Sequence, residues 1–474
     1  MDYKRLKKFM VLRFAILIIF INITVCNAQM KKPDLFVESG TFISGGRNTP
    51  FWLLSNQYGK YSNNTFNITY SAGAKALFDT SRNIDYGYGV ELFNRIDGKY
   101  NLYPHELYMA FKLWFFDIHF GWREETYGNA YQPLTMGNLL WSGNARPMPK
   151  ISINIPEFTP VPFTKGFLEF KGNLAHGWFE NDRYVKHVYM HHKSLIGRIG
   201  GKWPVNFSYG LHHFAQWGGD SPDYGHLPSS FKDFITIFKA DSTSDNYNVS
   251  GENINRLGNH IGSRNFGLDI KTKKFNMGLY MQTVFEDSSG EAWRNIKDGF
   301  WGIFWENKKV EALIHAVLFE FLNTTDQSGP LHDYYIGDSL VVLGGDDNYF
   351  NNYIYMDGWT YYDNTICTPL ITSNIYDSKT VKTLPNNKVE AYHFAIDGKI
   401  WDGQYKLLIN YNKNYGLHKA RYIPPRENIC MLASYALFSE KLNGMFCFDL
   451  GLDFGKMYGN NLGLKITYKR EFNL

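Results

Sequence analysis

Residues 446–454 read FCFDLGLDF, and this stretch decides the fold class of the chain. Phenylalanine or leucine occupies every second position, and the positions between them hold Cys447, Asp449, Gly451 and Asp453. Successive side chains of a β-strand point to opposite faces, so a period of two indicates one apolar face and one polar face. The stretch therefore predicts a β-strand rather than a helix.

The same alternation recurs along the chain over unusual lengths. It covers residues 66–78, 168–178 and 462–468, where apolar side chains again alternate with polar or small ones. Strands of soluble proteins usually have about five or six residues, whereas a tilted strand needs about 9–11 residues to cross a bilayer. Segments of this length favour membrane-spanning strands.

A soluble β-sandwich would also alternate, so the composition has to separate the two folds. Tyr (33), Phe (37) and Trp (12) make up 17% of the chain, and aromatic residues gather near strand ends, as at Trp114, Phe115 and Phe116. Transmembrane barrels carry aromatic girdles at both membrane interfaces. We therefore expect an all-β fold, a transmembrane antiparallel β-barrel.

The N-terminus has the pattern of a secretory signal peptide. Five basic residues lie among the first thirteen, and an apolar run follows from Phe14 to Ile21. This run is too short to span a bilayer, and the small residue Ala28 offers a cleavage site. We expect removal of residues 1–28 and export to the outer membrane of a Gram-negative bacterium; lipidation at Cys26 is the weaker alternative, because Val25 is not small.

Removal of the leader leaves 446 residues of the 474. At roughly 20–30 residues per strand with its loop, this length gives about 16–18 strands, and bacterial barrels favour even numbers. No linker divides the chain, so we expect a single barrel domain over residues 29–474 with long extracellular loops. The longest irregular segment, at about 324–388, is rich in Gly, Asn, Asp and Tyr, and loops of this length are commonly functional.

The net charge excludes one class of partner. The whole chain has 49 basic and 45 acidic residues, and the leader contributes five and one of them. The mature chain therefore has 44 of each and is formally neutral. Nucleic-acid binding requires a basic face, so we expect no nucleic-acid partner.

The mature chain keeps three cysteines, Cys367, Cys430 and Cys447. A hairpin turn near residues 441–444 would place Cys447 opposite about Ala436, several positions from Cys430. The Cα atoms of a disulfide lie within about 7 Å of each other. We therefore expect no structural disulfide.

Several long motifs resemble one known family. The motifs are LWSGNARPMPKISINIPEFTPVPFTKGFLEFKGNLAHGWFENDRYV (140–185), LHHFAQWGGDSP (211–222) and GGDDNYFNNYIYMDGWTYY (344–362). They are similar to the capsule assembly proteins of the Wzi type, especially the Bacteroidetes branch. The resemblance implies a monomeric outer-membrane barrel of about 18 strands with a closed lumen, and a lectin that binds, anchors or helps assemble capsular polysaccharide or exopolysaccharide.

Other functions stay open beside this resemblance. The main alternative is an outer-membrane pore for sugars or small solutes, and an outer-membrane hydrolase is a third. Besides polysaccharide, we expect outer-membrane lipid as a partner, and the sequence leaves open whether the polysaccharide export machinery also contacts the chain.

The stretch NARPMPKI (144–151) has an unusual composition for a barrel. Prolines cannot donate ladder hydrogen bonds, so we expect an irregular segment that plugs the lumen or caps one rim. Buried charges are normally paired, and lumen-facing acids such as Glu169 could pair with the two cations. The lumen or plug residues predicted are Arg146, Pro147, Pro149 and Lys150, with direct ligand contact as the alternative.

Candidate sugar-binding residues lie in loops that combine aromatic rings with polar groups. Aromatic faces stack on sugar rings, while carboxylates and amides bind hydroxyl groups. Three loops offer both, at 215–226, 286–295 and 344–352, although their own hydrogen bonds could equally account for these residues. The candidates are Trp217, Asp220, Asp223, Tyr224, Trp293, Arg294, Asp346, Asp347, Tyr349 and Trp359.

Metal and catalytic sites are weakly indicated. Adjacent histidines in a strand point to opposite faces, so neither the pair at 191–192 nor the pair at 212–213 can bind one ion. Asp346, Asp347 and Asn348 offer oxygen ligands for calcium, but their spacing matches no defined loop. No nucleophile, acid and base stand out together. We therefore expect no cofactor, no metal and no enzyme activity.

Overall fold

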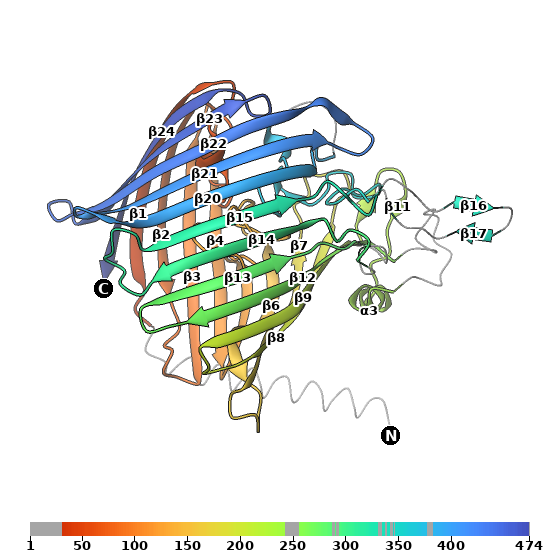
Figure 1. Cartoon of the computed structure of the whole chain (residues 1–474), viewed down its shortest axis with the longest axis horizontal. Coiled ribbons are helices and arrows are strands. Elements are labelled where there is room, and N and C mark those ends of the chain that lie inside the picture. The colour runs from red at the N-terminus through yellow and green to blue at the C-terminus, as the bar shows by residue number, and fades with distance from the viewer. Residues whose placement is uncertain are drawn as a thin grey trace, which may run out of the picture.

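The computed structural model describes residues 31–473, except 242–255, 287–289, 291–292, 330–333, 337–338, 342–344, 346 and 377–382. Its main feature is an 18-stranded antiparallel sheet that closes because β24 pairs with β1 (Figure 1). The barrel strands are β1 (Asp34–Gly46), β2 (Phe66–Ala76), β3 (Ile84–Ile96), β4 (Tyr100–Leu113), β5 (Phe116–Trp122), β6 (Pro149–Pro160), β7 (Leu168–Trp178), β8 (Tyr189–Ile199), β9 (Val205–Trp217), β12 (Asn259–Lys271), β13 (Phe275–Gln282), β14 (Gly299–Asn307), β15 (Ala316–Asn323), β20 (Lys388–Ile400), β21 (Gly403–Gly416), β22 (Arg421–Ser439), β23 (Gly444–Gly455) and β24 (Asn461–Asn473). The predicted all-β barrel is confirmed.

Smaller elements lie in the connections between the barrel strands. Among the described residues they comprise the helices α2 (Phe51–Leu54) and α3 (Phe231–Lys239), the 3-10 turn η1 (Asn374–Tyr376), and the hairpins of β10 (Asp220–Ser221) with β11 (Gly225–His226), β16 (Tyr334–Ile336) with β17 (Ser339–Val341), and β18 (Thr360–Tyr361) with β19 (Asn364–Thr365). In this part of the chain, no helix is both long and apolar enough to cross a membrane. The predicted signal peptide, residues 1–28, lies outside the described residues.

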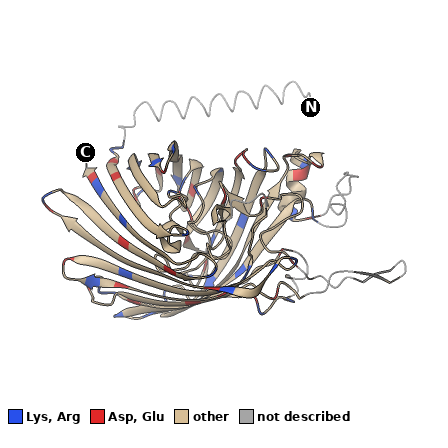
Figure 2. Cartoon of the chain, turned by 90° about the horizontal axis from the view of Figure 1, so that it is seen from above, with Lys and Arg blue, Asp and Glu red and all other residues tan. Residues whose placement is uncertain are grey.

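The outer wall of the barrel is apolar. In β23 the apolar residues of FCFDLGLDF point outward and Asp449 and Asp453 point inward and are buried. Outward Leu195, Leu211 and Leu464 are all at least 40% exposed to solvent, and Figure 2 shows that uncharged residues dominate the strands. A continuous exposed apolar wall is stable only in lipid, so these strands cross a membrane.

The two ends of the barrel differ in their connections. The described chain termini, at the start of β1 and the end of β24, lie at one end, where short turns such as 114–115 and 401–402 join the strands. The long loops 123–148, 179–188, 218–258 and 324–387 lie at the other end. Short turns face the periplasm in such barrels and long loops face outward, so we call this second end the outer rim.

The strands found from alternation agree closely with the structure. The segment 168–178 is β7 from end to end, and 446–454 lies inside β23. The register pairs Cys447 with Ala436 and Cys430 with Asp453, and all three described cysteines are free. The prediction for the hairpin register is confirmed.

Loops from the outer rim fold back into the lumen and fill it. The buried apolar core contains Leu134, Met136 and Trp141 from the loop 123–148, together with Phe350, Trp359 and Leu370 from the loop 324–387. We call this lumen-filling material the plug. The inward positions Gly451 and Gly463 leave room for α2, because a Cβ atom on either would lie within 3.0 Å of Pro50 or Leu53.

The stretch NARPMPKI is divided between plug and wall. Residues 144–148 are irregular and mostly buried, but Pro149 and Lys150 begin strand β6. Pro149 pairs with Trp122 of β5, and Lys150 pairs with Gly121 of β5 and with Gly177 of β7. The expectation of a wholly irregular segment is therefore wrong for these two residues, because a proline is tolerated at the first position of a strand.

Candidate functional site

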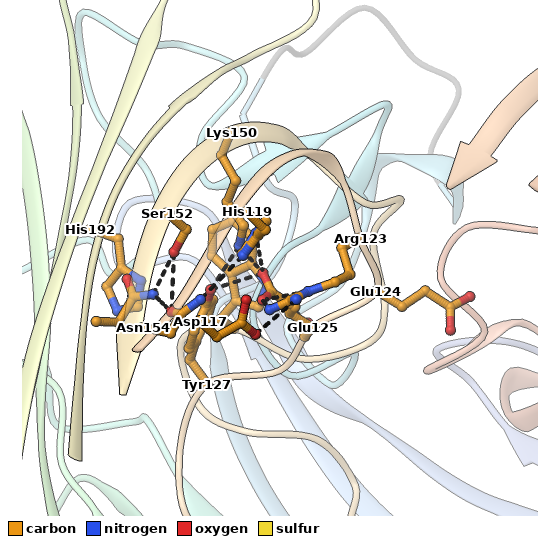
Figure 3. A network of polar contacts seen from close by, with 12 residues as sticks. Asp117, His119, Arg123, Glu124, Glu125, Tyr127, Lys150, Ser152, Asn154 and His192 are labelled. Atoms are coloured by element: carbon orange, nitrogen blue, oxygen red, sulfur yellow. Dashed lines mark hydrogen bonds and ion pairs between the residues drawn. The ribbon is translucent and has the colours of Figure 1, made fainter. Parts of the chain in front are cut away.

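A buried ionic network fastens the plug to the barrel wall (Figure 3). Its centre is Glu125, the third residue after β5. The Glu125 carboxylate lies 2.5 Å from Lys150 Nζ and 2.8 Å from Arg123 Nη2, and it accepts a hydrogen bond of 2.9 Å from Tyr127 Oη. Arg123 also pairs with Asp117 of β5 at 2.9 Å. The network therefore links two wall strands to the start of the plug loop.

Charge balance keeps Glu125 ionised. Burial alone would raise the pKa of this carboxyl, but the positive charges of Lys150 and Arg123 outweigh burial and hold the pKa below its ordinary range. The pairing with Glu169 expected from the sequence is wrong: Glu169 pairs with Arg198 across β7 and β8. Arg146 instead lies between two aromatic rings, 3.8 Å from the centre of Tyr103 and 4.7 Å from that of Tyr362.

A second polar cluster lies between β3, β4 and the plug loop. Glu91, His105 and Glu124 bring three ligand atoms within 4.8 Å of one another, a spacing that suits a metal ion. However, Lys60 Nζ lies 3.4 Å from Glu91 and 3.2 Å from Glu124. The lysine already supplies the positive charge that a metal would bring, so this cluster is a salt-bridge network.

Two loops of the outer rim are held together by the buried residue Arg183. Its guanidinium donates hydrogen bonds to the backbone carbonyls of Thr360 at 3.1 Å and Gly358 at 3.3 Å, and it pairs with Glu180. Glu180 in turn accepts a hydrogen bond from the backbone N–H of Tyr362 at 3.1 Å. Arg183 thus joins the loop 179–188 to the hairpin of β18 and β19.

The third loop, 218–229, joins through its own contacts. Asp220 accepts hydrogen bonds from His187 at 2.7 Å and from His226 at 2.8 Å, and Tyr184 donates to Asp223. Acids, imidazoles and tyrosines from three loops therefore lie side by side at the outer rim. We call this set the loop surface: Asp182, Tyr184, His187, Asp220, Asp223, His226, Tyr362 and Asp363.

Four aspartates make the loop surface acidic. Hydrogen bonds from His226 and His187 lower the pKa of Asp220, so this acid stays ionised as an acceptor. Burial and the nearby charges of Asp357 and Asp182 raise the pKa of Asp363. The surface offers hydrogen-bond acceptors and donors beside exposed tyrosine rings, and Tyr362 is 44% exposed.

The internal cavities suit a small molecule better than a polymer, and the one between Lys171, Asp269 and Tyr280 has a volume of about 340 Å³. The cavity beside the Glu125 network has a volume of about 220 Å³ and is lined by Lys171, Asn173 and His212 among others. Small-molecule sites usually have about 300–1,000 Å³. This cavity lies inside the barrel wall, so the loop surface remains the better candidate for a polymer.

Comparison with known proteins identifies the family of the chain. The profile of the family described as capsule assembly protein Wzi matches residues 53–370, about two thirds of the chain. The chain belongs to the Wzi family. No curated protein sequence matches it.

The solved structure of a distant relative supports the fold of this Wzi family member. The structure of Wzi from Escherichia coli, described as an outer-membrane protein involved in group 1 capsule assembly and as a carbohydrate-binding β-barrel, has 14% sequence identity and a TM-score of 0.61. The match covers 94% of this chain and 85% of that one. OpdL from Pseudomonas aeruginosa has 8% identity and a TM-score of 0.48, covering 94% and 100%. The barrel fold, the outward apolar wall and the family all indicate the outer membrane as the location of the protein.

Several predicted sugar-binding residues are not accessible in the structure of this Wzi family member. Trp217 is 3% exposed, because α3 covers it, while Tyr349 and Trp359 are fully buried in the plug. The indole of Trp359 donates to the carbonyl of Leu140 at 2.9 Å. The expectation that these three rings face a sugar is corrected: they hold the plug and α3 in place.

The remaining candidates fall in three places. Asp220, Asp223 and Tyr224 lie in the loop 218–229, and the first two belong to the loop surface. Trp293 and Arg294 are exposed but lie elsewhere, since Trp293 packs on Arg264 and on Phe266 of the outer wall. Asp347 is buried and accepts a hydrogen bond from Ser328 at 2.6 Å. Asp346 lies outside the described residues, so the calcium alternative has no described trio of ligands.

The sequence did not single out Tyr184, Arg183 or Tyr362. Tyr184 and Arg183 stand in the motif WFENDRYV, and Tyr362 ends GWTYY. Arg183 stands in a short loop between two long strands, which is a weak signal for a residue that joins loops. Its carbonyl partners lie about 175 residues away in the sequence, so the local sequence does not reveal them.

Proposed function

We propose that this protein is a non-enzymatic outer-membrane protein that binds capsular polysaccharide or exopolysaccharide and anchors or helps assemble it at the cell surface. The binding site is the loop surface. The protein works as a monomer in this proposal, and closure of the sheet through β1 and β24 supports it because the barrel offers no strand edge for pairing with a second copy.

The observation that carries this proposal is the fastening of three loops into one surface. Arg183 and its carbonyl partners, together with the contacts of Asp220 with His187 and of Asp223 with Tyr184, fix the loops relative to one another, so the tyrosines and acids need little ordering when a ligand binds. Preorganised groups lose less entropy on binding. A rigid strip of aromatic and acidic groups on the outer rim suits an extended, hydroxyl-rich polymer.

The pore alternative is less well supported by the molecule. The plug carries a continuous buried apolar cluster across the lumen, and Thr135 and Met136 bind Glu320 on the wall at 2.5 and 2.7 Å. A solute would have to displace this core. Purified protein is therefore expected to show no steady single-channel conductance in planar bilayers.

The experiment is a binding titration of detergent-purified protein with the organism's own surface polysaccharide, with an unrelated glycan as a specificity control. We expect saturable binding to the cognate glycan. Tyr362→Ala and Asp223→Asn should each weaken it about tenfold, which corresponds to about 1.4 kcal/mol.

The matched control is Tyr100→Ala, which removes another exposed tyrosine from the outer rim, 68% exposed, at the start of β4. Its affinity should equal that of the wild type. Equal losses in all three variants, or no binding by the wild-type protein, would reject the loop surface as the site.

A further inference from the structure

The helix α3 lies outside the barrel, beside its wall. It begins with a capping box formed by Ser230 and Asp233 and ends at Ala240. Figure 1 places it beside the strands at the end away from the C-terminus. The helix follows β9 in a loop of the outer rim, so it sits near the outer membrane interface.

The seat of α3 is built from outward-facing side chains of β7, β8 and β9. Its Phe234 ring contacts His176 at 6.0 Å, His191 at 5.6 Å and Trp217 at 5.8 Å between ring centres. Its Ile237 is fully buried. These wall residues share one face with Leu195 and Leu211, because side chains two positions apart in a strand lie on the same face. The helix therefore covers the upper part of the lipid-facing wall.

A second apolar stripe of the same helix is largely exposed among the described residues. Phe231 is 79% exposed, Phe238 39% and Ile235 37%. At 100° per residue these three lie together, next to the buried stripe, and the exposed Lys232 and Lys239 border them on the side away from that stripe. A helix with adjacent apolar and basic strips has the pattern of one that lies in a membrane interface.

The exposed stripe continues the membrane-facing wall. The carbonyl of Phe238 accepts a hydrogen bond from Lys193, whose Nζ also lies 4.7 Å from the Phe238 ring centre. Two residues further along β8, in the direction of the periplasm, outward Leu195 is 64% exposed. Trp293, on the neighbouring part of the wall, packs on Phe266 as an interfacial tryptophan would.

We infer that α3 is an interfacial anchor whose Phe231, Ile235 and Phe238 insert into the outer leaflet of the outer membrane, while Lys232 and Lys239 bind its anionic head groups. The partner is a lipid surface because the stripe joins a wall that already faces lipid and because lysines border it. The anchor would hold the barrel at a fixed depth and tilt, with the loop surface outward.

The test uses nitroxide labels on the whole mature chain, without the leader and its Cys26, in nanodiscs of phosphatidylcholine and phosphatidylglycerol. One label is placed through Ile235→Cys on the exposed stripe and one through Thr236→Cys on the polar side of the same helix. Both variants carry Cys447→Ala, because Cys367 and Cys430 are fully buried. Collision rates with oxygen and with a water-soluble nickel complex report membrane depth.

The label at 235 should lose nickel accessibility relative to the label at 236 and gain oxygen accessibility. Lys232→Gln with Lys239→Gln should reduce this difference in discs with phosphatidylglycerol and leave it unchanged in discs of phosphatidylcholine alone. Equal nickel accessibility at 235 and 236 in folded protein would overturn the inference and leave the stripe to a soluble partner. Heat-dependent gel mobility identifies the folded barrel in each variant.

Discussion

Replacing Glu125 by glutamine should loosen the plug without unfolding the barrel. Glutamine keeps the size of the side chain and an oxygen that can accept from Tyr127, but it removes the negative charge beside Lys150. The side chain of Lys150 is only 1% exposed and that of Glu125 13%. The variant would therefore leave a lysine ammonium buried without an anion.

The magnitude follows from this burial. Removing one partner of a buried ion pair costs about 3–5 kcal/mol. Lys150 keeps its 2.8 Å hydrogen bond to Tyr127 and lies over the rings of Tyr127 and Trp141, so we expect the lower end, about 3 kcal/mol. Each 1.4 kcal/mol is a factor of ten, so opening of the plug loop should become about a hundredfold more frequent.

The assay is amide hydrogen exchange of the peptides covering residues 126–148, which reports the free energy of local opening. The matched control is Glu169→Gln, because Glu169 forms a partly buried pair with Arg198 between the two wall strands β7 and β8. A double variant, Glu125→Leu with Lys150→Met, removes both charges and should restore much of the protection. Unchanged exchange in Glu125→Gln, or equal acceleration in Glu169→Gln, would refute the assignment of this pair as the fastening of the plug.

Two further predictions concern stability at low pH and the packing of α3. Burial would raise the pKa of Glu124, but its hydrogen bond to His105 and the charge of Lys60 lower it to about 2. A lowered pKa stabilises the fold above the ordinary value of 4.5, so Glu124 should contribute a loss of about 3 kcal/mol as pH falls from 4.5 to 2. The acid-induced loss seen by thermal unfolding should be smaller by this amount in Glu124→Gln. Trp217→Ala should release α3, accelerating amide exchange over residues 231–240 because a large buried ring is lost, while polysaccharide affinity stays as in the wild type; a loss of affinity without faster exchange would contradict this role.

The strands were predictable because their signal is local. Alternation within 446–454 or 168–178 needs only the neighbouring residues, and it is this pattern that the lipid outside and the polar lumen impose. Barrel closure and strand number then follow from length and from the need to leave no open edge in a membrane. The Cys447 register was equally predictable, since a short hairpin fixes which residues face each other.

The candidate site was only partly predictable because burial depends on distant segments. From the sequence, Trp217 is expected to be an exposed loop aromatic. It is buried because α3, which begins more than ten residues later, docks on the outer wall. Trp359 is likewise hidden only because the loop 324–387 folds into the lumen. Lys150 could be recognised as a paired cation, but its partner Glu125 depends on how the loop 123–148 turns back.

The long-range contacts of the plug have a consequence for biogenesis. Leu134 accepts a hydrogen bond from His393 of β20, and the backbone N–H of Phe51 donates to Asp453 of β23. Loops near the N-terminus can therefore form these contacts only after the C-terminal strands have been made. Full packing of the plug therefore requires β20 and β23 to be in place. Chains that stall before that step would display loose, protease-sensitive loops, which gives the cell a chemical signature by which unfinished copies can be removed.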